Sequence, residues 1–246
     1  MPAPQDPFAA VARLEGVPSA FAATRDGIDS LLRDRGLRRG SPGTTGESLL
    51  RGAAATAALE GVPYDLDGLR AGRGDPLALA AARMSTELLG LVPVWDKAPL
   101  QALARLHALV AAGSAPAEDL GRPVDPAGAG RLTGLAQSVR EPTEAPGLVV
   151  AALVHAEVVT AAAFGAHNAV VARAAERIVL VSKGVDPASV TVPEAGHHAR
   201  ARSYREALEA YAGGGVDGVH RWLLYAADSF AIGAEVTPLD PPRSHR

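Results

Sequence analysis

The chain has 246 residues, a formal net charge of -3 and no cysteine. About half of its residues (48%) are apolar, enough for a sizeable core, so the length allows one large domain or two small ones. The small negative charge provides no overall field to attract nucleic acid or an anionic membrane. The lack of cysteine excludes disulfides, thiolate catalysis and cysteine-based zinc sites, and it fits a cytoplasmic protein.

We expect no secretory signal, because residues 1–7 are polar and rich in proline instead of basic and then apolar. The longest apolar stretch, Leu148 to Phe164, is shorter than the roughly 20 residues that span a bilayer. It also contains His155 and Glu157. We therefore expect a buried core helix there, and neither a membrane nor a nucleic acid as a partner.

Alanine, leucine and arginine dominate the chain, and apolar residues recur at steps of three and four, a period typical of helices. Proline and glycine clusters separate the helical segments. In chain order, helices are predicted at residues 19–35, 45–60, 76–91, 98–112, 127–139, 146–163, 168–183, 199–212 and 216–234. The predicted fold class is therefore all-α.

Three segments are predicted to be irregular. Gly40 to Gly43 forms a loop before the second helix, Gly113 to Pro126 is a longer stretch, and Pro238 to Arg246 is a mobile tail. No internal repeat, low-complexity tract or linker divides the rest of the chain. This favours a single domain over residues 1–246.

Residues 155–177 have the outline of a phosphate-binding motif at the junction of two helices. They resemble the core motif of the Fic family, H-P-F-x-[DE]-G-N-[GK]-R-x-x-R, which Phe164, Asn168 and Arg173 match. His155 also matches a histidine that lies seven residues before the catalytic position of the family.

The side chains that carry the chemistry of this motif are replaced. Ala162 stands at the catalytic histidine, Ala163 at the proline, Ala166 at the acidic residue that holds magnesium, and Val170 at the first arginine. His167 and Ala169 stand at the two glycines.

Segments before the core motif add to the resemblance. Residues 56–61, Thr-Ala-Ala-Leu-Glu-Gly, fit the [ST]-x-x-x-E-[GN] pattern of an inhibitory helix that many Fic proteins carry. Leu106-His107 and Gly121-Arg122 are similar to the leucine–histidine helix and the target-binding flap of the family. The resemblance covers residues 44–212 and implies a single-domain, Fic-like helical bundle with a short hairpin flap.

The same resemblance divides this domain into three parts. N-terminal helices cover residues 1–95 and include an inhibitory-like helix at 45–61. A Fic-like core follows over residues 96–212, and a C-terminal helix and tail occupy residues 213–246.

In the family, the motif histidine deprotonates a target hydroxyl, which attacks the α-phosphate of ATP and takes up AMP. Ala162 has no atom that accepts a proton, Ala166 has no carboxylate for magnesium, and Val170 has no charge to steady the triphosphate. We therefore expect no AMP transfer. We also expect no cofactor and no metal site, since no metal-ligand spacing is present.

His167 is gained where the motif has glycine, and the resemblance places Glu60 above the same pocket. We therefore predict that Glu60 and His167 are a catalytic acid/base pair for a lyase, dehydration or cyclisation step on a small organic substrate. The alternative for His167 is a surface or packing histidine. The alternative for Glu60 is a structural ion pair with Arg173, the last arginine of the motif.

The resemblance implies that five further residues contact the substrate, namely Thr56, Arg122, Phe164, Asn168 and Arg173. A second interpretation is a non-catalytic binding or regulatory module with a protein partner, and residual nucleotidyl transfer is a third. A homo-oligomer stays open. Of the other histidines, His155 and His107 are expected in the core, and His197-His198 in a solvated basic stretch.

Overall fold

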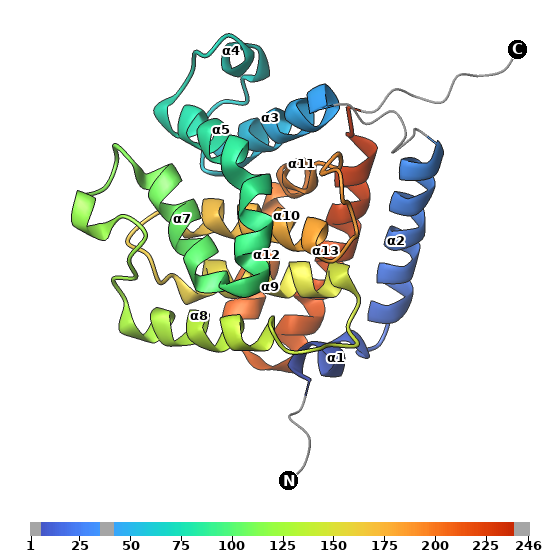
Figure 1. Cartoon of the computed structure of the whole chain (residues 1–246). Helices are drawn as coiled ribbons and strands as arrows, with labels where there is room; N and C mark the ends of the chain where they lie inside the picture. The colour runs from blue at the N-terminus through green and yellow to red at the C-terminus, as the bar shows by residue number, and fades with distance from the viewer. Residues whose placement is uncertain (1–5, 35–41, 239–246) are drawn as a thin grey trace, which may run out of the picture.

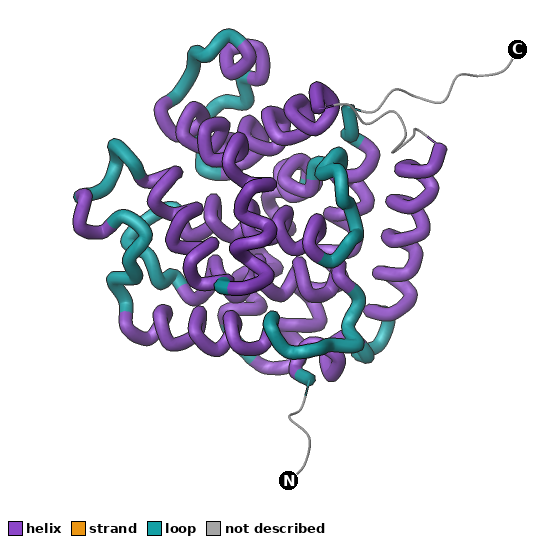
Figure 2. Tube along the Cα trace, in the orientation of Figure 1, coloured by secondary structure: helices purple, strands orange, loops and turns teal. Residues whose placement is uncertain are grey.

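The computed structural model of the chain describes residues 6–34 and 42–238. The helices in chain order are α1 (Pro7–Ala12), α2 (Val17–Asp34), α3 (Pro42–Leu59), α4 (Leu66–Arg70), α5 (Pro76–Leu88), α6 (Val92–Lys97), α7 (Pro99–Ala111), α8 (Pro126–Ser138), α9 (Gly147–Ala161), α10 (Asn168–Ser182), α11 (Pro193–Ala199), α12 (Ala201–Ala212) and α13 (Gly215–Glu235) (Figure 1). Short 3-10 turns lie at Leu89–Leu91 and Ala117–Asp119. The described residues contain no strand (Figure 2), so the predicted all-α class is confirmed.

Aspartate followed by proline marks the start of several helices. Asp6, Asp75 and Asp125 each accept hydrogen bonds from first-turn N–H groups of α1, α5 and α8, and proline occupies the first turn of each helix. An aspartate cap satisfies an N–H group that has no partner within the helix, and proline has no N–H to satisfy. Local chemistry therefore sets these boundaries.

Each predicted helix has a counterpart in the structure, but four short helices were not predicted: α1, α4, α6 and α11. Each has five to seven residues, too few for apolar periodicity to show. The predicted loop at residues 40–43 is wrong at Pro42 and Gly43, which begin α3. Gly40 and Ser41, like the tail from residue 239, lie outside the described residues.

Helices α9 and α10 form the centre of the molecule, with the other helices packed around them (Figure 1). Eleven of the fifteen residues of each helix are buried. Helix α9 is apolar on every side, as expected for a helix surrounded by protein. Its last turn and the first turn of α10 flank residues 162–167, called the motif loop below.

The segment between α7 and α8 takes the place of the expected hairpin flap. It contains one bridge between Ala112 and Ala115 and a 3-10 turn at Ala117–Asp119, so it is a compact loop and not a pair of strands. At its end, the N–H groups of Val124 and Asp125 donate to the Ala163 carbonyl at 2.8 and 3.2 Å. The flap is therefore attached directly to the motif loop.

One helical stretch, Pro76–Lys97, is long and apolar enough to cross a membrane by length and composition. It comprises α5, the turn at Leu89–Leu91 and α6, and it supplies Met84, Leu88 and Trp95 to the main hydrophobic core. Core helices commonly share this property with membrane spans.

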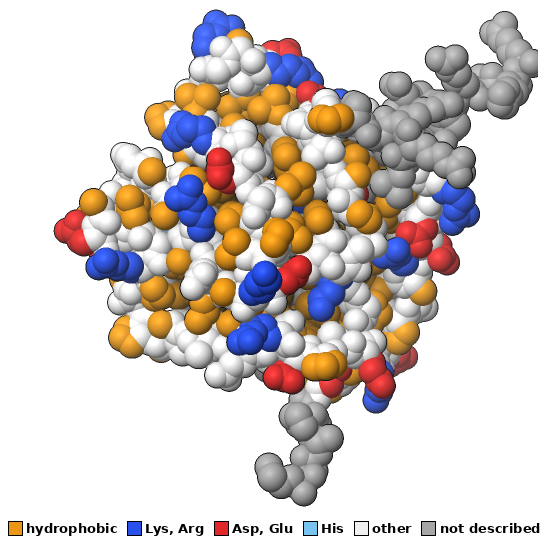
Figure 3. Space-filling model, in the orientation of Figure 1, with side chains coloured by type: hydrophobic (Ala, Val, Ile, Leu, Met, Phe, Trp, Pro, Cys, Tyr) orange, Lys and Arg blue, Asp and Glu red, His pale blue; other side chains and the backbone are white. Residues whose placement is uncertain are grey.

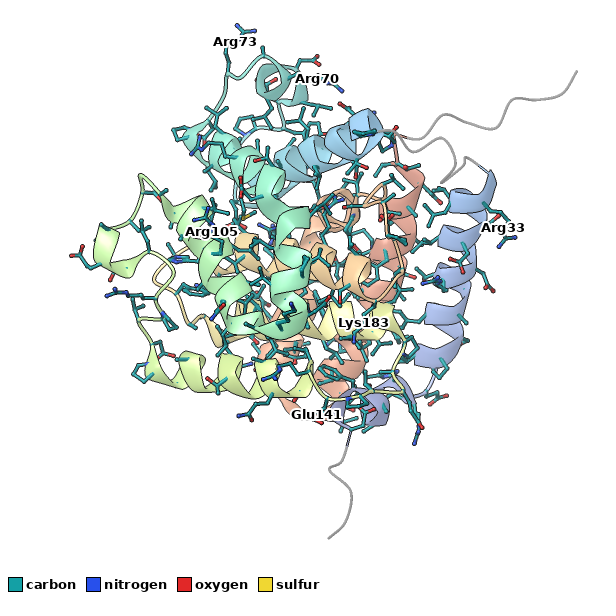
Figure 4. All side chains as sticks on the ribbon, viewed as in Figure 1. Arg33, Arg70, Arg73, Arg105, Glu141 and Lys183 are labelled. Atoms are coloured by element: carbon teal, nitrogen blue, oxygen red, sulfur yellow. The ribbon has the colours of Figure 1, made fainter. Side chains whose placement is uncertain are left out.

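Charged side chains on the visible face are dispersed. Figure 3 shows Lys and Arg interspersed with acidic and apolar side chains, without an extended area of one sign. Arg33 and Arg73 project outward in Figure 4, and both are exposed. The charged residues of α10 behave differently, because they lie inside the molecule.

Candidate functional site

The motif loop keeps a tight turn although His167 and Ala169 replace the two glycines of the family motif. Ala162 and His167, at its two ends, have left-handed backbone conformations with φ of 46° and 59°. The Asn168 side chain accepts from the Phe164 N–H (3.0 Å) and donates to the Phe164 carbonyl (2.8 Å). Histidine adopts a left-handed conformation more readily than most residues. The turn at position 167 is therefore retained without glycine.

Helix α8 also holds the loop in place. A Cβ on Gly128 would lie 2.3 Å from the Ala161 carbonyl oxygen and 2.8 Å from the Ala163 Cα. Only glycine permits this approach. The start of α8 therefore packs directly on the backbone of the loop.

His107 of α7 forms the inner wall of the loop. Its ring stacks on Phe164 with centroids 4.3 Å apart, and its Nδ1 accepts from the Gly121 N–H at 3.0 Å. Its Nε2 is buried against the Ala166 backbone without a well-formed hydrogen bond to any described residue. Burial and the neighbouring His167 lower the pKa of His107, so this imidazole is neutral at pH 7. The expected core location of His107 is confirmed.

His167 is half-buried and faces the flap. Its Nε2 lies 3.0 Å from Ser114 Oγ, and Ser114 Oγ also donates to the Ala111 carbonyl at 3.1 Å. If that hydroxyl proton goes to Ala111, His167 Nε2 must donate to Ser114. Ala162 and Ala166, the positions without base and carboxylate, are both exposed beside this pair.

The expected ion pair between α3 and the core is confirmed. Arg173 Nη2 donates to Glu60 Oε1 at 2.5 Å and lies 3.4 Å from the Thr56 carbonyl. The Arg173 side chain is 1% exposed and that of Glu60 30% exposed, so a buried cation reaches a half-solvated anion. Arg173 Nη1 donates to the Tyr204 hydroxyl at 3.2 Å, while its Nε has no hydrogen-bond partner in the described residues.

The structure does not bring Glu60 and His167 together through any hydrogen bond or ion pair among the described residues. Glu60 pairs with Arg173 and His167 with Ser114. His167 and Arg173 are six positions apart, which is about 9 Å along a helix at ~1.5 Å per residue. Arg122 lies exposed in the flap.

Two solved structures share this arrangement of helices. A Fic family protein from Desulfovibrio desulfuricans G20 superposes with a TM-score of 0.73 and 16% sequence identity, over 88% of this chain and 73% of that chain. Fic-1 (residues 134–508) from C. elegans superposes with a TM-score of 0.63 and 15% identity, over 95% of this chain and 77% of that chain. The chain has the Fic fold. No family model matches its sequence, and no curated protein matches it either.

Inside this Fic fold lies a polar network that the sequence analysis missed. It comprises His155, Glu176, His197 and Tyr204, contributed by α9, α10, α11 and α12. His155 is a fully buried core histidine, as expected. His197 is also fully buried, so its predicted place in a solvated stretch is wrong. The aromatic rings of Trp222 and its neighbours enclose it.

The hydrogen bonds of this network have a defined direction. Arg173 donates to the Tyr204 hydroxyl oxygen, so that hydroxyl gives its proton to His155 Nε2 at 2.9 Å. His155 Nδ1 then carries the proton that it donates to Glu176 Oε2 at 2.5 Å. From the other side, His197 Nε2 donates to Glu176 Oε1 at 3.1 Å. The carboxylate is therefore held by two imidazole N–H groups.

By donor type, these residues could hold a metal ion. The ligand atoms of His155, Glu176 and His197 lie within 4.8 Å of one another, and two imidazoles with a carboxylate suit zinc or iron. A metal on His155 Nδ1 would displace its proton and deprive the Tyr204 hydroxyl of its acceptor. Hydrogen bonds already satisfy the set, including His197 Nδ1, which accepts from Tyr225 at 2.9 Å. The geometry therefore fits a hydrogen-bond network better than a metal centre.

A second buried ion pair lies one turn further along α10. Arg177 makes a two-pronged contact with Glu194 of α11, at 2.9 Å from Nε and 2.5 Å from Nη2. Its Nη1 donates to Ser48 of α3 and to the Thr191 carbonyl. A Cβ on Gly52 would lie 2.8 Å from both Arg177 Nη2 and Glu194 Oε2, so glycine makes room for the pair.

We predict that Glu60→Ala lowers the free energy of unfolding by about 1–3 kcal/mol, because Arg173 would keep its charge in the interior without a carboxylate partner. Urea unfolding measures the change. Glu206→Ala is the matched control, since it removes an exposed partner of Arg202 and should change stability by less than about 0.5 kcal/mol. Equal effects of the two variants would contradict a stabilising role for the Glu60–Arg173 pair.

We predict that stability falls as the pH drops below about 6.5. Burial lowers the pKa of His155 from 6.5 to about 4, so between these values the unfolded chain binds a proton that the folded chain rejects. Burial alone would raise the pKa of Glu176, but His155 and His197 outweigh it and lower that pKa from 4.5 to about 2. Both shifts destabilise the fold in acid. Urea unfolding between pH 7.5 and 4 tests this, and a constant midpoint would contradict it.

Proposed function

We propose that this chain is a Fic-fold binding module that does not transfer AMP. The observation that carries the proposal is the state of Arg173, whose guanidinium is buried and already bound by Glu60 and Tyr204. An arginine that neutralises a protein carboxylate is not free to neutralise a triphosphate. Helix α3 thus occupies the position of a permanent inhibitor.

The replaced motif residues support the same conclusion. Ala162 and Ala166 face solvent without an acid/base or metal-binding atom, and Val170 is fully buried, where it cannot reach a phosphate. Phosphoryl chemistry depends on proton transfer, metal-ion stabilisation and charge neutralisation, and each replaced side chain removes one of these contributions. Among the described residues of the motif loop, His167 has an imidazole but none has a carboxylate or a guanidinium.

The start of α10 retains features of a small-anion site. Backbone N–H groups at a helix N-terminus favour a negatively charged group, and the N-cap residue His167 makes no side-chain capping bond. We therefore propose a ligand with one carboxylate or one phosphate group, such as a modified side chain of a protein partner or a small organic acid.

We predict that magnesium–ATP neither binds at micromolar concentration nor donates AMP, whereas inorganic phosphate binds weakly at the motif loop. Titration calorimetry with both compounds, and incubation with labelled ATP, measure this. His167→Ala should weaken phosphate binding by about tenfold, and Glu206→Ala should leave it unchanged. Transfer of label to the chain or to a target protein would overturn the proposal.

A second candidate is an acid/base enzyme, favoured by the contact between His167 and Ser114 beside a neutral His107. The role of Glu60 as the partner base remains a prediction, since this carboxylate is bound to Arg173. The reaction would be a lyase, dehydration or cyclisation step on a small organic acid.

We predict for this candidate that His167→Ala lowers turnover by about a hundredfold, the usual contribution of a general acid or base. Mass spectrometry of a panel of hydroxy acids incubated with the chain would reveal loss of water. Glu60→Gln tests whether Glu60 also takes part in catalysis. It lowers turnover as much as His167→Ala only if it does. Unchanged turnover in His167→Ala would remove the enzyme candidate and leave the binding module.

A further inference from the structure

A pocket of about 340 Å³ lies between α1, α8, α9, α12 and α13. None of its lining residues belongs to the motif loop. Its volume is at the lower end of the range of roughly 300–1,000 Å³ typical of small-molecule sites. We propose that this pocket binds a small neutral molecule with one apolar ring and one hydroxyl or amide group.

The walls of the pocket are mainly apolar. Phe8 and Val11 of α1, Leu135 of α8, Leu153 of α9 and Val219 of α13 surround it. Phe8, Leu135 and Leu153 are at most 8% exposed, so their remaining surface is turned toward the pocket and the neighbouring core. An apolar ring placed there would remove its own surface and that of the walls from water.

A polar cluster closes one end of the pocket. Arg131 contacts Glu157 through Nε and Nη2 at 2.8 and 2.9 Å, and it also binds the Thr160 carbonyl and hydroxyl, both at 2.8 Å. The Tyr211 hydroxyl donates to Glu157 at 3.1 Å. Burial, and then the adjacent Glu157, raise the pKa of Tyr211, so it stays a neutral phenol.

This cluster selects the charge of the ligand. Arg131 and Glu157 neutralise each other, so a charged ligand would lose hydration without gaining a counter-charge. Four of the five guanidinium N–H groups of Arg131 are used by the contacts above, which leaves one donor. The Tyr211 oxygen remains an acceptor. A donor and an acceptor that line the same pocket match a single hydroxyl or amide.

The pocket is separate from the motif loop on which the proposed function rests, but helix α9 contributes to both. Glu157 and Thr160 belong to the last turns of α9, which ends at Ala161, directly before the motif loop. A ligand at the polar cluster would therefore contact the segment from which the loop begins.

Two glycines of α8 provide a matched pair of variants. A Cβ on Gly134 or on Gly130 would meet no atom within 4 Å, and both glycines are exposed in the same helix. Gly134 lines the pocket, whereas Gly130 does not. Leucine favours helix at either position, so the two substitutions should differ only in filling the pocket.

The probe is p-cresol, a neutral ring with one hydroxyl, titrated into the full chain and followed by calorimetry and protein NMR. We expect saturable binding at millimolar concentrations or below. Gly134→Leu should weaken it by about tenfold or more, and Gly130→Leu should leave it unchanged. Benzoate, of similar size but charged, should bind about tenfold more weakly than p-cresol.

Circular dichroism and urea unfolding establish that both variants keep the fold. Absence of saturable p-cresol binding to the unmodified chain would overturn the proposal. So would equal binding by Gly134→Leu and Gly130→Leu, or benzoate binding as tight as that of p-cresol. Phosphate binding at the motif loop is measured separately, so failure of either site is distinguishable from failure of the other.

Discussion

The burial of three charged side chains in α10 constrains the rest of the structure. Arg173, Glu176 and Arg177 are each at most 2% exposed, and an unpaired charge in a protein interior is strongly destabilising. Their partners come from other helices. The turn after α3 supplies Glu60, α9 supplies His155, and α11 supplies His197 and Glu194. The need for partners of these buried charges therefore constrains where the helices pack, and apolar contacts fill the space between them.

The same constraint separates fold from activity. Side chains that neutralise α10 are structural, and they are present, whereas Ala162, Ala166 and Val170 stand where the family motif has its histidine, acidic residue and first arginine. A Fic fold can therefore persist where these motif side chains are replaced, since the stability of the fold depends on other residues. Arg173 belongs to both groups, because it is a residue of the family motif and also one of the buried charges of α10. Its charge is now used to attach α3 to the core.

Parts of the candidate site could be predicted because they depend on local sequence. Asn168 closes the turn with its own neighbour Phe164, and Glu60 lies in a short motif whose partner the resemblance identifies. Burial of His197 could not be inferred in this way. It precedes another histidine and several arginines in a polar segment, and only the packing of α11 against α13 places it at Glu176. One signal was available: Arg173, Glu176 and Arg177 interrupt an otherwise apolar helix, a pattern that requires buried partners.

The sequence by itself determined the all-α class, the positions of the long helices and the outline of the Fic motif, because each depends on periodicity, capping or spacing within a few turns of chain. Tertiary structure alone decided the short helices, the buried His155–Glu176–His197 network, the Arg177–Glu194 pair and the pocket beside Arg131. The network joins Glu176 to histidines 21 positions away on either side, and the pocket is lined by residues from Pro7 to Val219. Such contacts are selected by the total balance of charge and packing in the folded chain, which no local pattern encodes.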